Sequence, residues 1–260
     1  MPRFAANLSM MFPEVELPQR FEAARRAGFS AVEYLRPYND SVADLQHYIK
    51  QAGVELILLN TPLGDRPGDR GVGALPGREE DFRQCFDQAL DYATQLGAGM
   101  VHVMAGIVPE GVSADECERT FVANLRSVAD LAKARGVKLL LEPLNTRDVP
   151  GYLHTNTATT RRIIEAVGSD NVFLQYDFYH MQIMQGDLVE NMQRNLDIIG
   201  HMQFSSLPGR NEPQYGEVNF DHIFAAIDAS GYTGWLGCEY RPKHDTLEGL
   251  SWGKRFGLGA

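Results

Sequence analysis

The chain has 260 residues, of which 44% are hydrophobic and 22% are charged, so it can bury a large core without disulfides or structural metals. Its formal net charge of −10 argues against binding to nucleic acid or to an anionic membrane, because both partners usually require a basic surface. Its three cysteines are an odd number and show no CxxC spacing, which argues against a disulfide framework and against a thiolate zinc site.

The first residues contain one Arg and no apolar run long enough for a signal peptide. Elsewhere the apolar runs fall far short of the roughly 20 residues that a transmembrane helix needs. Together with the cysteine usage, this predicts a soluble cytoplasmic protein. A small anionic substrate is compatible with the net charge, since one local Arg can outweigh a diffuse negative field. The oligomeric state is left open, and a homo-oligomer is compatible with the sequence.

Eight short segments with the composition of β-strands follow one another along the chain: residues 3–8, 31–35, 54–59, 100–104, 138–142, 172–176, 201–204 and 235–239. The segments between them repeat apolar residues at the helical period, as Phe82, Phe86 and Leu90 do. Several end on a glycine typical of a helix C-cap, namely Gly28, Gly53, Gly97, Gly136 and Gly231. This alternation predicts a parallel sheet, and eight strands predict one (β/α)8 TIM barrel over residues 1–260.

One long irregular segment, residues 60–78, is rich in Gly, Pro, Asp and Arg and follows the third predicted strand. Barrel enzymes place active-site loops and lids after their strands, at the C-terminal face. We therefore favour a substrate-covering lid over a solvated surface loop for this segment.

Inward-pointing residues at the C-terminal strand ends of a barrel converge on one site. In this chain they are Asn7, Glu33, Asn60, His102, Glu142, Asp177, Gln203 and Glu239. A buried unpaired carboxylate is costly, so three of them at neighbouring strand ends make sense if a cation compensates their charge. Glu142, Asp177, Gln203 and Glu239 offer hard oxygen ligands, which suit Mg²⁺ or Mn²⁺. Alternatively, each could cap a helix or pair with a basic side chain.

Further polar residues surround this group. His180 follows Asp177 by three residues, and Arg210 lies just beyond the seventh strand, where its guanidinium could pair with a substrate carboxylate. The alternatives are a packed histidine for His180 and a surface ion pair for Arg210. Asn60 and His102 could orient a substrate or could fill the barrel mouth as satisfied polar groups.

Several motifs, spread over nearly the whole chain, resemble the hydroxypyruvate isomerase family of xylose isomerase-like TIM barrels. They are RFAANLSMMF, ALPGREE, LLLEPLN, LQYDFYHMQ, GHMQFSSLPGRNEP, GEVNF and GYTGWLGCEYRP. The motifs divide between two subgroups. AANLSMMF, NTP, ALPGRE and VHVMAG favour 2-oxo-tetronate isomerase, whereas EPLN and QYDFYHMQ favour hydroxypyruvate isomerase.

The resemblance implies roles for particular residues. Glu142 and Glu239 match paired catalytic glutamates that also contact the metal, and Asp177 and Gln203 match the remaining ligands. His180 and Arg210 match substrate-contacting positions of more distant sugar epimerases, in which the position of Gln203 is usually histidine. The implied activity is aldose–ketose isomerisation of a small 2-oxo acid through an enediolate, with Mg²⁺ or Mn²⁺ as a Lewis acid and no organic cofactor.

Three other functions compete with this interpretation. A ketose 3-epimerase would use the same two glutamates on the two faces of one carbon. A metal-dependent endonuclease of abasic DNA would need more histidine ligands and a basic groove, and the seven scattered histidines and the net charge of −10 argue against it. A non-catalytic barrel that binds sugar acids would require the carboxylate cluster to be inert.

Overall fold

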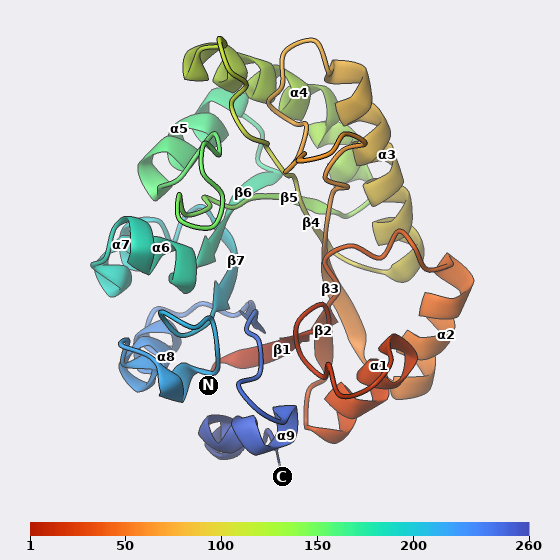
Figure 1. Ribbon diagram of the computed structural model, residues 1–260, viewed down its shortest axis with the longest axis vertical. Coiled ribbons are helices and arrows are strands. Elements are labelled where there is room, and N and C mark those ends of the chain that lie inside the picture. The colour runs from red at the N-terminus through yellow and green to blue at the C-terminus, as the bar shows by residue number, and fades with distance from the viewer. Residues whose placement is uncertain (260) are drawn as a thin grey trace.

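The computed structural model describes residues 1–259 and confirms the predicted fold, a closed barrel of eight parallel strands surrounded by helices (Figure 1). The strands are β1 (Arg3–Asn7), β2 (Ala31–Glu33), β3 (Glu55–Asn60), β4 (Met100–His102), β5 (Lys138–Leu141), β6 (Val172–Asp177), β7 (Ile199–Phe204) and β8 (Trp235–Cys238). Each strand pairs with the next along the chain, and β8 pairs with β1 to close the barrel. All eight predicted strands are present, with bounds that differ by a residue or two.

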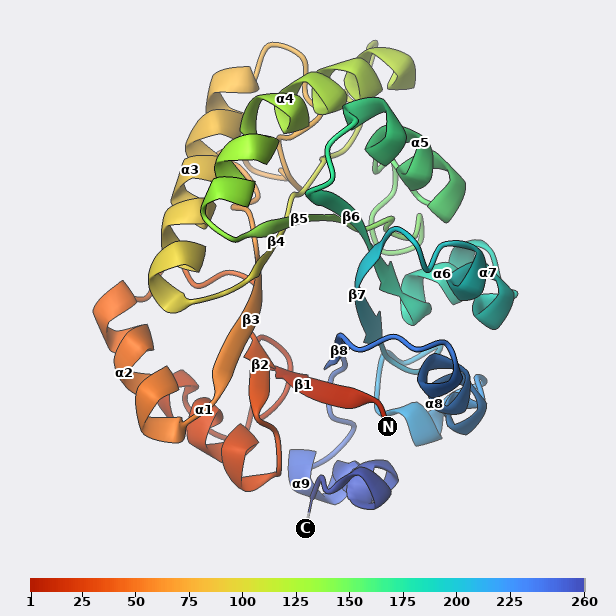
Figure 2. The ribbon, with the colours of Figure 1, turned by 180° about the vertical axis from the view of Figure 1, so that it is seen from behind.

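The helices form an outer ring, which is also seen from behind in Figure 2. They are α1 (Leu17–Arg26), α2 (Val42–Ala52), α3 (Glu79–Leu96), α4 (Ala114–Ala134), α5 (Thr157–Val167), α6 (Phe178–Met184), α7 (Leu188–Arg194), α8 (Phe220–Ala229) and α9 (Thr246–Gly249), with the 3-10 helices η1 (Pro213–Tyr215) and η2 (Leu250–Phe256). Within residues 1–259, no helix combines the length and the apolar character needed to cross a membrane.

Capping and apolar periodicity explain where these helices form. Ser41 accepts a hydrogen bond from the backbone N–H of Asp44 at the start of α2, as an N-cap residue does. Gly53 and Gly97 end α2 and α3 in the left-handed conformation, with φ of 66° and 75°, which confirms two of the predicted C-caps. The other three predicted glycines also have positive φ but lie one residue beyond the C-cap: Gly28, Gly136 and Gly231.

The alternation of side chains along the strands positions the site. Ala5, Ala31, Leu58 and Leu140 belong to one small apolar cluster, separate from the larger core. Two residues further along the same strands stand Asn7, Glu33, Asn60 and Glu142. Because residues two apart in a strand point to the same side of the sheet, these four polar side chains lie on the same side as the apolar cluster, nearer the C-terminal end of the barrel. The barrel therefore has an apolar floor and a polar C-terminal end.

The C-terminal segment packs on the outside of the barrel through an aromatic cluster. The ring centroids of Trp252 and Phe256 lie 5.1 and 5.0 Å from that of Phe4 in β1, and Phe224 of α8 contacts all three rings. Edge-to-face pairs at these distances add to the stabilisation that apolar burial provides. This cluster fixes the segment after β8, which follows the site residue Glu239.

Candidate active site

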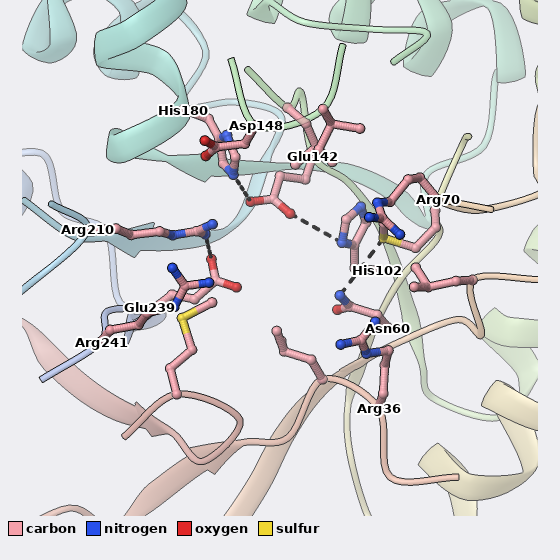
Figure 3. Close-up of a pocket in the computed structure, with 16 residues that line it drawn as sticks. Arg36, Asn60, Arg70, His102, Glu142, Asp148, His180, Arg210, Glu239 and Arg241 are labelled. Atoms are coloured by element: carbon pink, nitrogen blue, oxygen red, sulfur yellow. Dashed lines mark hydrogen bonds and ion pairs between the residues drawn. The ribbon is translucent and has the colours of Figure 1, made fainter. Parts of the chain in front are cut away.

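Four of the polar residues predicted at the strand ends, Asn60, His102, Glu142 and Glu239, line a cavity of about 470 Å³ (Figure 3). Six of the eight predicted site residues line it, namely Asn60, His102, Glu142, His180, Arg210 and Glu239. Asp177, at the end of β6, adjoins them, with its Oδ2 3.6 Å from Nε2 of His180. Met10, Met104 and Leu144 contribute apolar parts of the wall. The cavity thus combines buried carboxylates with apolar surfaces, as ligand pockets usually do.

The two neighbouring carboxylates Glu142 and Asp177 fit a bound cation. One oxygen of each carboxylate and a ring nitrogen of the neighbouring His180 all lie within 4.8 Å of one another. Oε1 of Glu142 and Oδ2 of Asp177 are buried and have no hydrogen-bond donor among residues 1–259. The second oxygen of Asp177, Oδ1, accepts from the backbone N–H of Tyr179 at 2.9 Å. Buried polar atoms normally have partners, so the two unpartnered oxygens are suited to an ion.

The hydrogen bonds of His180 show which of its ring nitrogens carries the proton that faces Glu142 and Asp177. Nδ1 accepts from the backbone N–H of Asn145 at 3.0 Å, so it carries no proton. Burial, and then the charge of Arg210, hold the pKa of His180 well below its usual range, so the ring is neutral and its proton is on Nε2. Nε2 lies 3.8 Å from Oε1 of Glu142. His180 therefore presents an N–H to the cavity rather than a lone pair for a metal.

Arg210 lies beside the other catalytic candidate. Its Nη2 is 2.8 Å from Oε2 of Glu239 and 3.6 Å from Oδ2 of Asp177, and its guanidinium stacks over the Tyr179 ring at 4.7 Å. Its backbone φ is 52°, a value that residues other than Gly rarely adopt, and its backbone N–H donates to the carbonyl of Ser206. Arg210 is thus fixed toward Glu239, and the predicted contact with a substrate carboxylate stays a prediction.

Burial shifts the acid–base properties of the cavity. It raises the pKa of Glu239 to about 8 and that of Asp177 to about 6, although Arg210 lowers both. The pKa of Glu142 rises well above its usual value through burial and the charges of Glu239 and Asp177. Burial lowers the pKa of His102 to about 3, so this ring is neutral. A cation in the cavity would oppose these upward carboxylate shifts.

Asn60 and His102 both open onto the cavity. His102 is fully buried, and its Nδ1 lies 3.3 Å from Oε2 of Glu142. The Oδ1 of Asn60 is buried without a hydrogen-bond donor among residues 1–259. These contacts support a role for His102 in orienting Glu142, whereas Asn60 offers a free acceptor to a ligand.

Gln203 lies beside Asp177 in the parallel pairing of β6 and β7, but its amide belongs to a buried hydrogen-bond network. Its Oε1 accepts from Gln175 at 2.5 Å, and its Nε2 donates to Oε2 of Glu33 at 2.8 Å. Glu33 also accepts from Asn7 and lies 2.5 Å from Nε2 of His201. The predicted ligand role of Gln203 stays a prediction, because its oxygen already has one donor. Our sequence analysis missed Gln175 and His201, which the period-two spacing to Asp177 and Gln203 could have revealed.

The segment of residues 60–78 contributes to the wall of the cavity and is held in place by ion pairs. Arg78 is only 8% exposed and contacts Asp65, Asp69 and Asp81 at 2.7, 2.9 and 2.6 Å, which ties the segment to the start of α3. Gly71 pairs with Ala105 in an isolated antiparallel bridge. The segment supplies the lining residues Asn60, Leu63 and Arg70, which confirms its predicted position at the C-terminal end of the barrel, and the predicted lid stays a prediction.

The chain is similar to several known proteins over nearly its whole length. The sequence profile described as "Xylose isomerase-like TIM barrel" matches residues 21–256. A 2-oxo-tetronate isomerase of Cupriavidus necator is 44% identical over 98% of this chain and 99% of its own length. A hydroxypyruvate isomerase of Escherichia coli is 42% identical over 97% of this chain and 98% of its own length. A crystal structure from Brucella melitensis, described as AP endonuclease, family 2, is 42% identical and superposes with a TM-score of 0.96 over 98% of this chain and 99% of its own.

The raised carboxylate pKa values lead to a test of metal binding. Carboxylate ligands must be ionised to bind a cation, so adding Mg²⁺ to the metal-free protein at pH 7 should release protons, mainly from Glu142 and Glu239. Calorimetric titration in two buffers of different ionisation enthalpy measures this release. Fewer protons should be released at pH 9, which is above the pKa of Glu239, and fewer should be released by Glu239→Gln. The control variant Glu110→Gln, at an exposed position, should release as many protons as the wild type. Identical enthalpies in both buffers would contradict the assignment.

Proposed function

We propose, from the premise that the chain belongs to the hydroxypyruvate isomerase family of xylose isomerase-like TIM barrels, that it isomerises a small 2-oxo acid. The substrate is hydroxypyruvate, which gives tartronate semialdehyde, or 2-oxo-tetronate, which gives 3-oxo-tetronate. Two buried glutamates that point into one cavity, Glu142 and Glu239, carry this proposal (Figure 3). Both subgroups of relatives match at similar identity, so identity does not choose between the two substrates.

The two glutamates move one proton between neighbouring carbons. One glutamate removes a proton from the carbon that bears the hydroxyl, and an enediolate forms. The other glutamate, which starts protonated, delivers a proton to the former carbonyl carbon, and the proton of the hydroxyl passes to the former carbonyl oxygen, so the carbonyl moves without net oxidation or reduction. A proton then passes from the first glutamate to the second and restores their starting states. A pKa of about 8 for Glu239 lies near neutral pH, where a group can both accept and donate a proton. Which glutamate acts first depends on the direction of the reaction.

The neighbouring side chains support this transfer. His180 directs its Nε2–H into the cavity, where it can donate to the oxygen on which negative charge develops. Arg210 orients Glu239 through the 2.8 Å contact, and His102 lies beside Glu142. The apolar walls at Met10, Met104 and Leu144 limit the access of water to the enediolate.

A divalent ion completes the proposal. Glu142, Asp177 and Glu239 would hold it, with Gln203 as a fourth ligand, and the two unpartnered buried oxygens of Glu142 and Asp177 support the fit. Three carboxylates and an amide oxygen suit Mg²⁺, with Mn²⁺ as the second choice. When bound, the ion supplies Lewis-acid polarisation of the substrate carbonyl.

The rival functions make different demands on this cavity. A ketose 3-epimerase could use the same glutamates, and product analysis distinguishes it, because epimerisation leaves the carbonyl in place. The description of the Brucella melitensis structure raises the endonuclease alternative. Two histidines, His102 and His180, adjoin the candidate metal ligands, whereas the endonuclease needs several histidine ligands. The net charge of −10 also disfavours DNA binding. A non-catalytic barrel that binds sugar acids would not account for the buried carboxylates and their raised pKa values.

The glutamate pair gives the first test of this mechanism. Glu142→Gln and Glu239→Gln keep the side-chain shape but cannot transfer a proton. Each should therefore reduce kcat by at least ~10²-fold, the lower end of what general acid–base catalysis contributes. The assay is turnover at saturating Mg²⁺, so that weakened metal binding does not mask the chemical effect. Exposed Glu110→Gln is the matched control and should keep wild-type turnover. Near-normal kcat in either site variant would refute the two-glutamate mechanism.

The second test concerns Gln203 as a ligand. Gln203→His replaces an amide oxygen with an imidazole nitrogen, which favours later ions such as Co²⁺ or Zn²⁺. After chelation, wild-type activity should recover best with Mg²⁺ or Mn²⁺, and the variant should shift its preference toward Mn²⁺ or Co²⁺. Each ion is titrated back into both proteins, with binding and turnover measured. Identical preference orders would mean that Gln203 acts only within the network of Glu33 and Gln175.

A further inference from the structure

Arginines surround the mouth of the cavity, and most of them have no acidic partner. Arg36, Arg70, Arg210 and Arg241 all line it. Arg210 is paired with Glu239 and Asp177. The other three are exposed, and no carboxylate of residues 1–259 lies within 4.0 Å of their guanidinium groups. Their charges are therefore available to a ligand.

The cavity lining is less negative than the protein as a whole. Four arginines face three acidic residues, Glu142, Asp148 and Glu239, within a chain of net charge −10. With Asp177, which adjoins the lining, the formal charges cancel, so the three unpaired arginines are free to attract small anions to the cavity.

The backbone on either side of Arg70 and Arg36 is held in place. Gly71 donates from its N–H to the carbonyl of Leu63 at 2.8 Å. A Cβ at Gly71 would lie 2.5 Å from the carbonyl oxygen of Met104, so only glycine permits this close approach. Leu35, next to Arg36, accepts from the backbone N–H of Asn60 at 2.9 Å. Both arginines therefore extend from fixed points.

These two arginines lie on one side of the cavity. Figure 3 shows Arg36 and Arg70 on the side of Asn60 and His102, whereas Arg241 lies with Arg210 and Glu239 across the cavity. An anionic group held by Arg36 and Arg70 would thus leave the carbons next to it between the two catalytic glutamates.

We propose that Arg70 and Arg36 form the subsite that binds the carboxylate of the substrate. Guanidinium groups bind carboxylates through paired hydrogen bonds, which gives orientation as well as affinity. Arg210 then orients Glu239, while Arg36 and Arg70 on the opposite side select 2-oxo acids over neutral ketoses of the same length. This inference rests on the proposed isomerase function and names the feature by which the site would recognise its substrate class.

Substitution of each arginine by glutamine tests the subsite. Arg70→Gln and Arg36→Gln should each raise KM for hydroxypyruvate or 2-oxo-tetronate by about 10- to 100-fold, the range for a hydrogen bond to a charged group. The effect on kcat should be much smaller, because this contact is made equally in the ground and transition states. Turnover of the neutral ketoses dihydroxyacetone and erythrulose should change little. The matched control is Arg66→Gln, at an exposed arginine of the same segment that does not line the cavity.

Binding of glycerate, which has a carboxylate and hydroxyls but no carbonyl, provides a readout without turnover. Calorimetry should show about 10-fold or greater weakening in Arg70→Gln and wild-type affinity in Arg66→Gln. The subsite would be overturned if Arg70→Gln lost as much activity on neutral ketoses as on keto acids, or if Arg66→Gln had the same effect as Arg70→Gln. It would also be overturned if Arg210→Lys or Arg241→Gln, but not Arg70→Gln, lost activity on keto acids alone. If the wild type turned over neither keto acid, the proposed function would fail, and glycerate binding would still decide the subsite.

Discussion

The central physical constraint is the burial of three carboxylates, those of Glu142, Asp177 and Glu239, around one cavity. Removing a carboxylate from water strongly disfavours its charged form, and mutual repulsion adds to this cost. The upward shifts of all three pKa values express that penalty. Arg210 offsets part of it for Glu239 and Asp177 through contacts of 2.8 and 3.6 Å. In the function that we propose, a bound cation would offset the rest, and the glutamates would act as proton carriers beside a substrate.

The barrel supports this arrangement by building polar layers on an apolar floor. Glu33, at the end of β2, receives hydrogen bonds from Asn7 and Gln203 and is therefore satisfied inside the barrel. Gln203 in turn lies next to Asp177 in the pairing of β6 and β7. The orientation of a candidate ligand thus depends on residues that contact neither metal nor substrate, as is common in metal sites. Arg36, Arg70 and Arg241 line the same cavity without an acidic partner among residues 1–259.

Strand order and strand ends could be predicted from the sequence, because apolar runs that end in Glu142, Asp177 and Glu239 repeat at regular positions along the chain. The convergence of six of the eight predicted site residues on one cavity follows from barrel closure. Side-chain pairing could not be predicted. Whether Arg210 meets Glu239 or a ligand depends on a turn with positive φ, and the two partners of Gln203 come from two other strands, β2 and β6. The fixed position of residues 60–78 depends on Arg78, whose three acidic partners are up to 13 residues away.

The most direct test of the account is the fate of the carbonyl group during turnover. Purified protein, stripped of metal and reloaded with Mg²⁺, is incubated with hydroxypyruvate and, separately, with 2-oxo-tetronate, and the products are identified by NMR. The account predicts that the carbonyl moves to the neighbouring carbon of at least one of these acids, and that chelation abolishes the reaction until Mg²⁺ is restored. A product whose carbonyl has stayed in place, or no reaction with either acid, would contradict it.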